Sequence, residues 1–176
     1  MSARVLLIFA LALFVCGSAA AFDGKRQGFV FGVGTGMNPY TRISPEPSDS
    51  REKGLALQAL FGYAQNDHNL LALEGNISTR FFASHGFFGP TWYRYFGKPG
   101  KAFYSALGLG MYYYNEDKLF GESTHHEKGF GYMIGGGYEF ARHIQMGVYY
   151  AGGTTHFDNV DYSLGHFSVM VTFAVF

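Results

Sequence analysis

Cysteine and charge are both scarce in this chain of 176 residues, and each shortage excludes a class of protein. The only cysteine is Cys16, near the amino terminus, so disulfides cannot hold together the segment that follows. Charged residues make up 15% of the chain, against a usual quarter or so, and the formal net charge is zero. Without a basic or an acidic run, the composition argues against a nucleic-acid partner. A charged, hydrated surface of the ordinary kind is excluded as well.

Long apolar runs are also scarce, and the one run of note lies at the start of the chain. Residues 5–15 follow Arg4 and lead into small residues that end at Ala21, which is the layout of a secretory signal peptide. A membrane-spanning helix would need about 20 apolar residues, more than this run contains. The sequence therefore predicts a cleaved signal peptide over residues 1–21 and one exported domain over residues 22–176.

The domain is rich in glycine, with 25 in the chain, and in aromatic residues, which make up 19%. Apolar side chains alternate with small or polar ones in eight segments, the two-residue period of a strand, and no helical period competes with it. The clearest segment sets Leu71, Leu73 and Ile77 against Glu74 and Asn76. The poorest is GPTWYRYF, residues 89–96, because proline and tryptophan share a face with arginine there if the tyrosines take the other face.

The connections between these segments alternate between short and long. Three are tight (NDHN, GKPGK and ARH), and three are long and polar (NPYTRISPEPSDSREK, NEDKLFGESTHHEK and GGTTHFDNVDYS). Only ASHGF departs from the rule by being brief. Tight turns at one end and long loops at the other are typical of an up-and-down meander, and an even number of strands lets the meander close.

The distribution of charge predicts which face lines the interior. A water-facing sheet normally carries many charges. The small and polar face of these segments has no lysine and only four charged residues, Glu74, Arg80, Arg94 and Glu139. Phe, Leu, Val, Ile and Met therefore face lipid, and the fold class is all-β: an eight-stranded antiparallel up-and-down transmembrane β-barrel. Tyrosines near predicted strand ends suit aromatic girdles, namely Tyr63, Tyr93, Tyr95, Tyr113, Tyr132 and Tyr150.

The last segment, FSVMVTFAVF, runs to Phe176, and a terminal strand of this kind stays ordered if it pairs with the first. With its signal peptide, eight alternating segments, asymmetric loops and terminal Phe176, the chain resembles the small eight-stranded bacterial outer-membrane proteins of the OmpA and OmpX type. The resemblance implies location in the cell outer membrane, among its lipid and lipopolysaccharide. It also implies that Phe176 is an assembly signal read by the barrel-assembly machinery.

The four charged residues of the inner face would be costly if isolated. We expect Glu74, Arg80, Arg94 and Glu139 to form a lumenal polar network with hydrogen-bonding neighbours, for which the candidates are Gln58, Tyr104, Tyr112 and Tyr149. An ion or proton path is the functional alternative. Eight strands enclose room for side chains only, which favours a filled lumen.

Two loop segments contain groups that bind metals. His125 and His126 lie between acidic residues in ESTHHEK, and His156 and Asp158 lie in THFDNVD. Neither segment has a recognised ligand spacing, so a solvated loop is favoured and no metal or cofactor is predicted.

An enzyme is the main alternative function. Lipid A deacylases share this size and architecture, and they carry a His and a Ser two residues apart on the penultimate strand. Here HFDN puts Asp158 where the Ser should be, and Ser163 and His166 are three apart and so project to opposite faces. The sequence favours a non-enzymatic outer-membrane barrel that serves envelope structure or surface interaction through its outer loops. A lipid A-modifying hydrolase remains the alternative.

Overall fold

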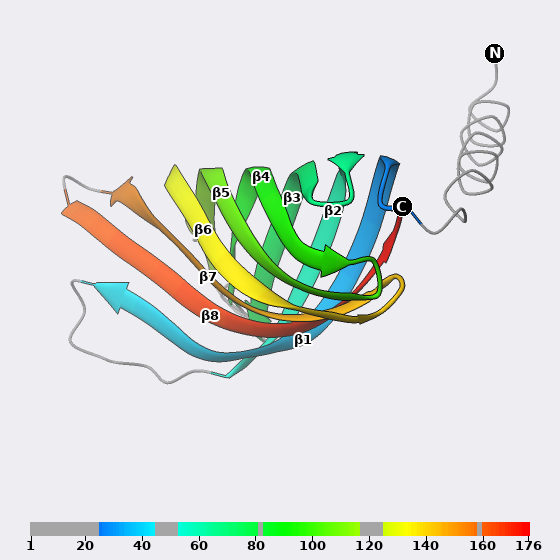
Figure 1. Ribbon diagram of the computed structural model, residues 1–176. Coiled ribbons are helices and arrows are strands. Elements are labelled where there is room, and N and C mark those ends of the chain that lie inside the picture. The colour runs from blue at the N-terminus through cyan, green and yellow to red at the C-terminus, as the bar shows by residue number, and fades with distance from the viewer. Residues whose placement is uncertain (1–24, 45–52, 81–82, 117–124, 158–159) are drawn as a thin grey trace, which may run out of the picture.

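The computed structural model describes residues 25–44, 53–80, 83–116, 125–157 and 160–176, so the predicted signal peptide lies outside the described residues. The described chain forms eight strands that close into one barrel in sequence order (Figure 1). Their bounds are β1 Gly28–Ser44, β2 Gly54–Asn66, β3 Asn69–Arg80, β4 Ala83–Lys98, β5 Lys101–Glu116, β6 His125–Ala141, β7 Ile144–Phe157 and β8 Val160–Val175. Within the described ranges, no helix is long and apolar enough to cross a membrane.

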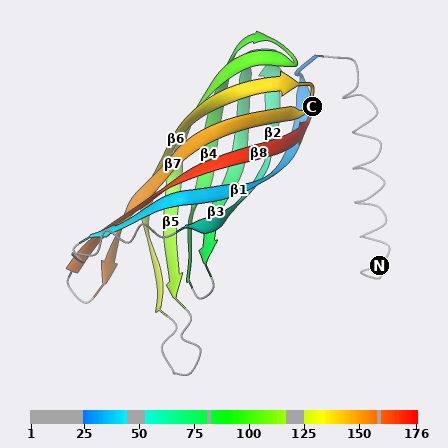
Figure 2. The same cartoon turned by 90° about the horizontal axis from the view of Figure 1, so that it is seen from below.

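Every strand pairs antiparallel with its neighbours, and β1 closes the barrel against β8. The seam runs from the pair Phe31 and Val175 to the pair Ser44 and Ser163, with one irregularity between Met37 and Tyr40. The carboxyl terminus thus lies beside the start of β1 (Figures 1 and 2). The predicted eight-stranded antiparallel up-and-down barrel is confirmed, and a last strand held on both sides accounts for its order at the end of the chain.

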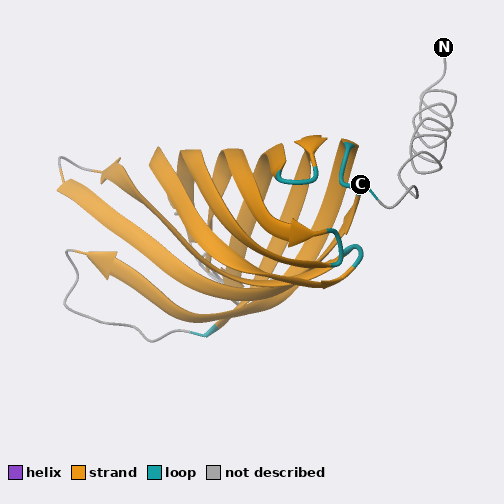
Figure 3. Cartoon of the chain, in the orientation of Figure 1, coloured by secondary structure: helices purple, strands orange, loops and turns teal. Residues whose placement is uncertain are grey.

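Tight turns join the strands at this same end of the barrel (Figure 3). Two residues each connect β2 to β3, β4 to β5 and β6 to β7. Left-handed backbone occurs in two of these turns, at Gly100 with φ 85° and at His143 with φ 71°. His143 is held there by two hydrogen bonds to Ala174 of β8, because its carbonyl accepts from the Ala174 amide at 2.8 Å and its Nδ1 lies 2.8 Å from the Ala174 carbonyl.

Large apolar side chains stand on the outside of the barrel, and the interior holds the buried residues. On β5, Leu107, Leu109 and Met111 are exposed, whereas Ala106 and Tyr112 are buried. This alternation repeats around the barrel, as the two-residue period of a strand requires. The exposed apolar residues include Phe29, Val33, Leu57, Phe61, Leu73, Trp92, Phe103, Phe130, Ile134, Val148, Val169 and Val171.

The facing predicted for β4 was wrong. Tyr93 and Tyr95 point into the barrel and are buried, while Trp92 is exposed and Arg94 is half-buried on the same outward face. The two tyrosines therefore do not belong to an aromatic girdle, in contrast to the exposed Tyr63. The reason is that buried phenols need hydrogen-bond partners, and both find them inside the barrel.

Candidate functional site

The interior of the barrel at the tight-turn end is organised by an arginine that precedes the first strand. Arg26 is 1% exposed, and its guanidinium forms an ion pair with the carboxylate of Glu139, which is 2% exposed. The same guanidinium donates to the carbonyl of Asp67 in the β2–β3 turn and lies 3.8 Å from the centre of the Tyr95 ring. A buried charge is thus matched by an opposite charge, a carbonyl and an aromatic face.

Phe176 closes the interior at this end. Its side chain is buried, its ring packs edge-on against Tyr95 and stacks on His143, and it lies 5.5 Å from the guanidinium carbon of Arg26. The terminal residue therefore points inward, unlike the neighbouring outward Phe173.

A second polar group lies deeper and is centred on Glu74, which is fully buried. Its carboxylate accepts hydrogen bonds from Gln58 Nε2 at 2.5 Å and from the Tyr93 hydroxyl at 2.6 Å. Gln58 Oε1 in turn accepts from the Thr172 hydroxyl at 2.6 Å. These four residues come from β2, β3, β4 and β8, so the group ties four strands together across the interior.

Tyrosines fill the space between the two groups. The hydroxyls of Tyr104 and Tyr149 lie 2.6 Å apart, and the Tyr95 hydroxyl donates to Gln145 at 3.0 Å. The rings of Tyr93, Tyr95 and Tyr104 lie with their centres 5.5 to 6.4 Å from one another. Apolar rings with polar tips let this part of the barrel be packed and hydrogen-bonded at once.

A third group lies in the half of the barrel nearer the long connections and contains two buried histidines. His166 Nδ1 lies 2.9 Å from the Tyr112 hydroxyl, and its Nε2 lies 3.3 Å from Asn76 Oδ1. The ring of His85 meets His166 edge-on, with the centres 4.9 Å apart. His85 Nε2 also lies 3.4 Å from the hydroxyl of Thr41.

The structure separates the four charged residues predicted to share the interior. Glu74 and Glu139 are inside, in different groups. The prediction that Arg94 lines the interior was wrong. Its side chain lies on the outward face and donates to Asn69 Oδ1 at 2.9 Å. Arg80 belongs to β3, and its side chain lies outside the described part of the chain.

The sequence analysis missed several interior residues, among them Arg26, Tyr93, His85 and His166. Arg26 precedes the first alternating segment, so strand alternation could not predict which way its side chain points. Tyr93 was assigned to a girdle, and His85 precedes the stretch read as the fourth segment. His166 could have been found by extending the alternation of β8 upstream, because it shares the inward face of Ser168 and Met170.

The predicted loop histidines cannot be placed as ligands. His125 and His126 lie in β6 and His156 lies in β7, but their side chains are outside the described residues, as is the whole of Asp158. Among the residues that are described, no three His, Cys, Asp or Glu side chains come together as a metal site.

The arrangement of serine and histidine on β8 does not form a hydrolytic site. Ser163 is exposed while His166 is buried, so the two project to opposite faces as predicted. His166 and Ser168 do share the two-residue spacing of the deacylase motif. However, both are fully buried, and the imidazole bonds to Tyr112 and Asn76. The Ser168 hydroxyl has no hydrogen-bond partner among the described residues. A nucleophile requires a base within hydrogen-bonding reach and access for substrate.

Comparison with known proteins gives matches among solved structures. No family model and no curated protein sequence matches the chain. Neisserial surface protein A matches with a TM-score of 0.58 at 14% identity, over 87% of this chain and 99% of that one. The attachment invasion locus protein Ail of Yersinia pestis matches with a TM-score of 0.54 at 13% identity, over 84% and 99% respectively. This chain thus has the fold of the small eight-stranded β-barrels of the bacterial outer membrane.

Proposed function

We propose that the protein is an integral outer-membrane barrel with a filled lumen that acts through its presence in the envelope and through its outer connections. The observation that carries this proposal is the inversion of the barrel, with large apolar side chains exposed around its outside and polar groups buried within. In water such a surface would drive aggregation, whereas in lipid it is the stable arrangement. Closure of the sheet also supplies a partner for backbone groups that hydrocarbon could not solvate.

Two further features support location in the outer membrane. The signal peptide predicted over residues 1–21 would export the domain of residues 22–176, and β-barrels of this fold belong to that membrane. Lipid and lipopolysaccharide would then surround the barrel. The long connections would contact any extracellular partner. This agrees with a role in envelope structure or surface contact.

A filled lumen would make the protein a poor channel. The interior is occupied at successive levels by large buried side chains, including Tyr95, Tyr93, Tyr149, Met133 and Phe87. The test is conductance of the refolded protein in a planar lipid bilayer, for which we expect no resolved single-channel steps. Discrete, reproducible conductance steps would show that the barrel forms a pore and that its lumen is not filled.

Catalysis is not part of the proposal. The buried state of His166 and Ser168 supports a non-enzymatic barrel over a lipid A hydrolase. Incubation of the refolded protein with lipopolysaccharide should therefore leave the mass of lipid A unchanged. Loss of an acyl chain from lipid A would establish the alternative.

Phe176 is proposed as the signal for barrel assembly. Its ring is also part of the packed interior, so deletion would reduce stability as well as recognition. Phe176→Leu separates the two, because a similar apolar volume changes the stability of a packed site by less than about 1.5 kcal/mol. We expect this variant to refold in detergent like the parent but to accumulate poorly as folded barrel in cells, measured by heat-modifiable gel mobility. Equal amounts in cells would make the terminal aromatic ring incidental.

A further inference from the structure

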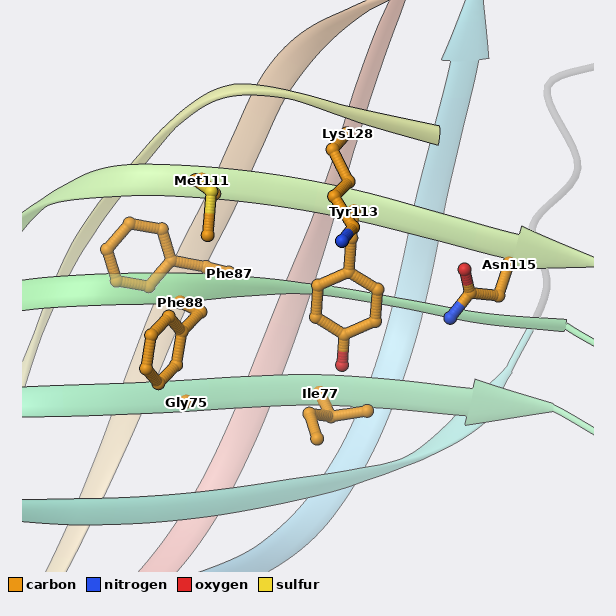
Figure 4. Close-up of a pocket in the computed structure, with 8 residues that line it drawn as sticks. All are labelled: Gly75, Ile77, Phe87, Phe88, Met111, Tyr113, Asn115 and Lys128. Carbon is orange, nitrogen blue, oxygen red and sulfur yellow. The ribbon is translucent and has the colours of Figure 1, made fainter. Parts of the chain in front are cut away.

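The outer wall of the barrel contains a groove of about 330 Å³ over strands β3 to β6 (Figure 4). It lies in the half of these strands nearer the long connections. Its apolar part is formed by Ile77, Phe88 and Met111, which belong to three neighbouring strands. The volume falls within the roughly 300–1,000 Å³ range of small-molecule sites.

One outward glycine lines the groove, and a second stands beside it. Across the sheet, Gly75 stands in a row with Phe88 and Met111, and Gly86 stands in the next row between Ile77 and Tyr113. Gly86 has no room for a side chain, because a Cβ atom would collide with the carbonyl oxygen of Asn76. At Gly75 there is free space, since a Cβ atom would have Phe88 Cδ2 at 3.8 Å as its nearest neighbour.

The groove is polar at one end. The ring of Tyr113 extends from β5 across β4 toward Ile77, and a Cβ atom at Gly86 would lie 3.1 Å from its hydroxyl (Figure 4). Lys128 of β6 pairs with Tyr113 and is exposed, and Asn115 stands two residues beyond Tyr113 on the same outward face. An ammonium, a phenol and an amide thus gather at the end of the groove toward the long connections. At the opposite end, formed by Gly75 and Phe88, none of the described lining residues is charged.

We propose that this groove seats one acyl chain of an anionic lipid whose phosphate is bound by Lys128. The chain would lie over Gly75 and between Phe88 and Ile77, and the phosphate would meet the ammonium at the polar end. The gradient from apolar to cationic along the wall matches the gradient along a lipid molecule. This site rests on the proposed function, because it needs the outer wall to face lipid.

The experiment uses tryptophan quenching by lipids that carry bromine on their acyl chains. Phe130 is exposed, lies beside Met111 and is two residues from Lys128, so Phe130→Trp in a Trp92→Phe background places one reporter at the edge of the groove. The refolded barrel is compared in phosphatidylcholine vesicles that contain either brominated phosphatidylcholine or brominated phosphatidic acid. One lysine near a membrane surface enriches an anionic lipid roughly fivefold, and this is the preference we expect at the reporter.

Matched variants distinguish binding of the lipid in the groove from nonspecific electrostatic attraction of anionic lipid to the barrel. Lys128→Gln and Gly75→Leu should each abolish the preference, the first by removing the charge and the second by filling the groove. Two control variants should retain it. Lys101→Gln removes the same charge at an exposed position at the other end of β5, and Thr35→Leu introduces a leucine at an exposed position on β1. Equal quenching by the two lipids in the reporter protein would overturn the proposal. The proposal would also be overturned if Gly75→Leu kept the preference for the anionic lipid. Lys128 would then attract the lipid without an acyl chain lying in the groove.

The natural Trp92 distinguishes this outcome from failure of the proposed function. Its ring is exposed on the outer wall of β4. If Trp92 in the unmodified protein is not quenched by brominated phosphatidylcholine, the wall does not face lipid and the outer-membrane proposal fails. If Trp92 is quenched but the reporter at 130 shows no preference, the groove alone is refuted. Heat-modifiable mobility of every variant verifies that it has folded before quenching is measured.

Discussion

At the scale of residues, the interior depends on charges that are buried with specific partners. The guanidinium of Arg26 pairs with the carboxylate of Glu139 and has two aromatic neighbours, Tyr95 and Phe176. Glu74 is held by an amide and a phenol instead. Removing one member of a buried ion pair leaves the other charge desolvated and uncompensated, which costs more than the pair itself contributes.

The ion pair at the tight-turn end gives the first prediction. Arg26→Met and Glu139→Gln should each lower the free energy of unfolding by about 3–5 kcal/mol, because each leaves a buried partner unmatched. The double variant should lose less than the sum of the two, since both charges are then absent. Urea unfolding of the barrel refolded in vesicles measures all three. Additive losses would mean that the two residues stabilise the barrel independently.

The second prediction concerns a residue of the outer wall. Leu109 is exposed near the middle of β5, so Leu109→Arg would place a charge in the centre of the bilayer and should cost about 2–4 kcal/mol of barrel stability. Leu109→Ala is the control, because it removes the side chain without adding charge. The natural Arg94 is tolerated on the outward face because it lies near the strand end, where a long side chain can reach the headgroups. Unchanged stability of Leu109→Arg in vesicles would refute the lipid-facing wall.

At the scale of elements, closure of the barrel depends on how closely β1 approaches β8. Gly36 of β1 stands opposite Met170 in this seam, and a Cβ atom there would collide with the carbonyl oxygen of Val169. Only glycine permits the approach, and the ladder that joins the first and last strands passes through this point.

Gly36→Ala should therefore weaken the seam, at a cost of about 1–3 kcal/mol typical of overpacking. Gly75→Ala is the matched control on β3, where the added methyl group meets free space and stability should stay within about 1 kcal/mol of the parent. The urea midpoints of the two variants provide the comparison. If Gly36→Ala unfolded at the parent's midpoint, β8 would have to shift freely against β1.

At the scale of the whole molecule, the barrel has two different ends. The tight turns, Arg26 and Phe176 lie at one end. At the other end, nine residues separate β1 from β2 and eight separate β5 from β6. Only two residues separate β7 from β8 there, so the long connection predicted over GGTTHFDNVDYS was wrong. Short turns lie on the periplasmic side of outer-membrane barrels and long loops lie outside, so we expect the tight-turn end to face the periplasm.

This orientation can be tested with two lysines at opposite ends. Lys53 precedes β2 beside a long connection, and Lys101 opens β5 after a tight turn; both are exposed. Residues 22–176 contain no cysteine, so Lys53→Cys and Lys101→Cys each create a single labelling site in this part of the chain. A membrane-impermeant maleimide applied to intact cells should label the first variant and not the second, and both after lysis. The reverse pattern in intact cells would invert the orientation.

The sequence alone determined the strands, their number and most of their facing. Alternation such as that of Leu71 and Leu73 with Glu74 assigns each side chain to a face, because the pleat of a strand has a period of two. The tight turns marked the ends of three hairpins, and the shortage of charge on the inner face indicated which side was inside. The eight strands and the apolar outer wall can be predicted from such local signals.

The tertiary structure decided which residues meet inside the barrel. The partner of Glu139 is Arg26, 113 positions away and outside every alternating segment. The facing of β4 likewise depended on hydrogen bonds that Tyr93 and Tyr95 make with residues of β3 and β7. Strand periodicity gives the direction of a side chain but not its height in the barrel. The tilt and stagger of all eight strands set that height together, so contacts across the interior exist only once the barrel has closed.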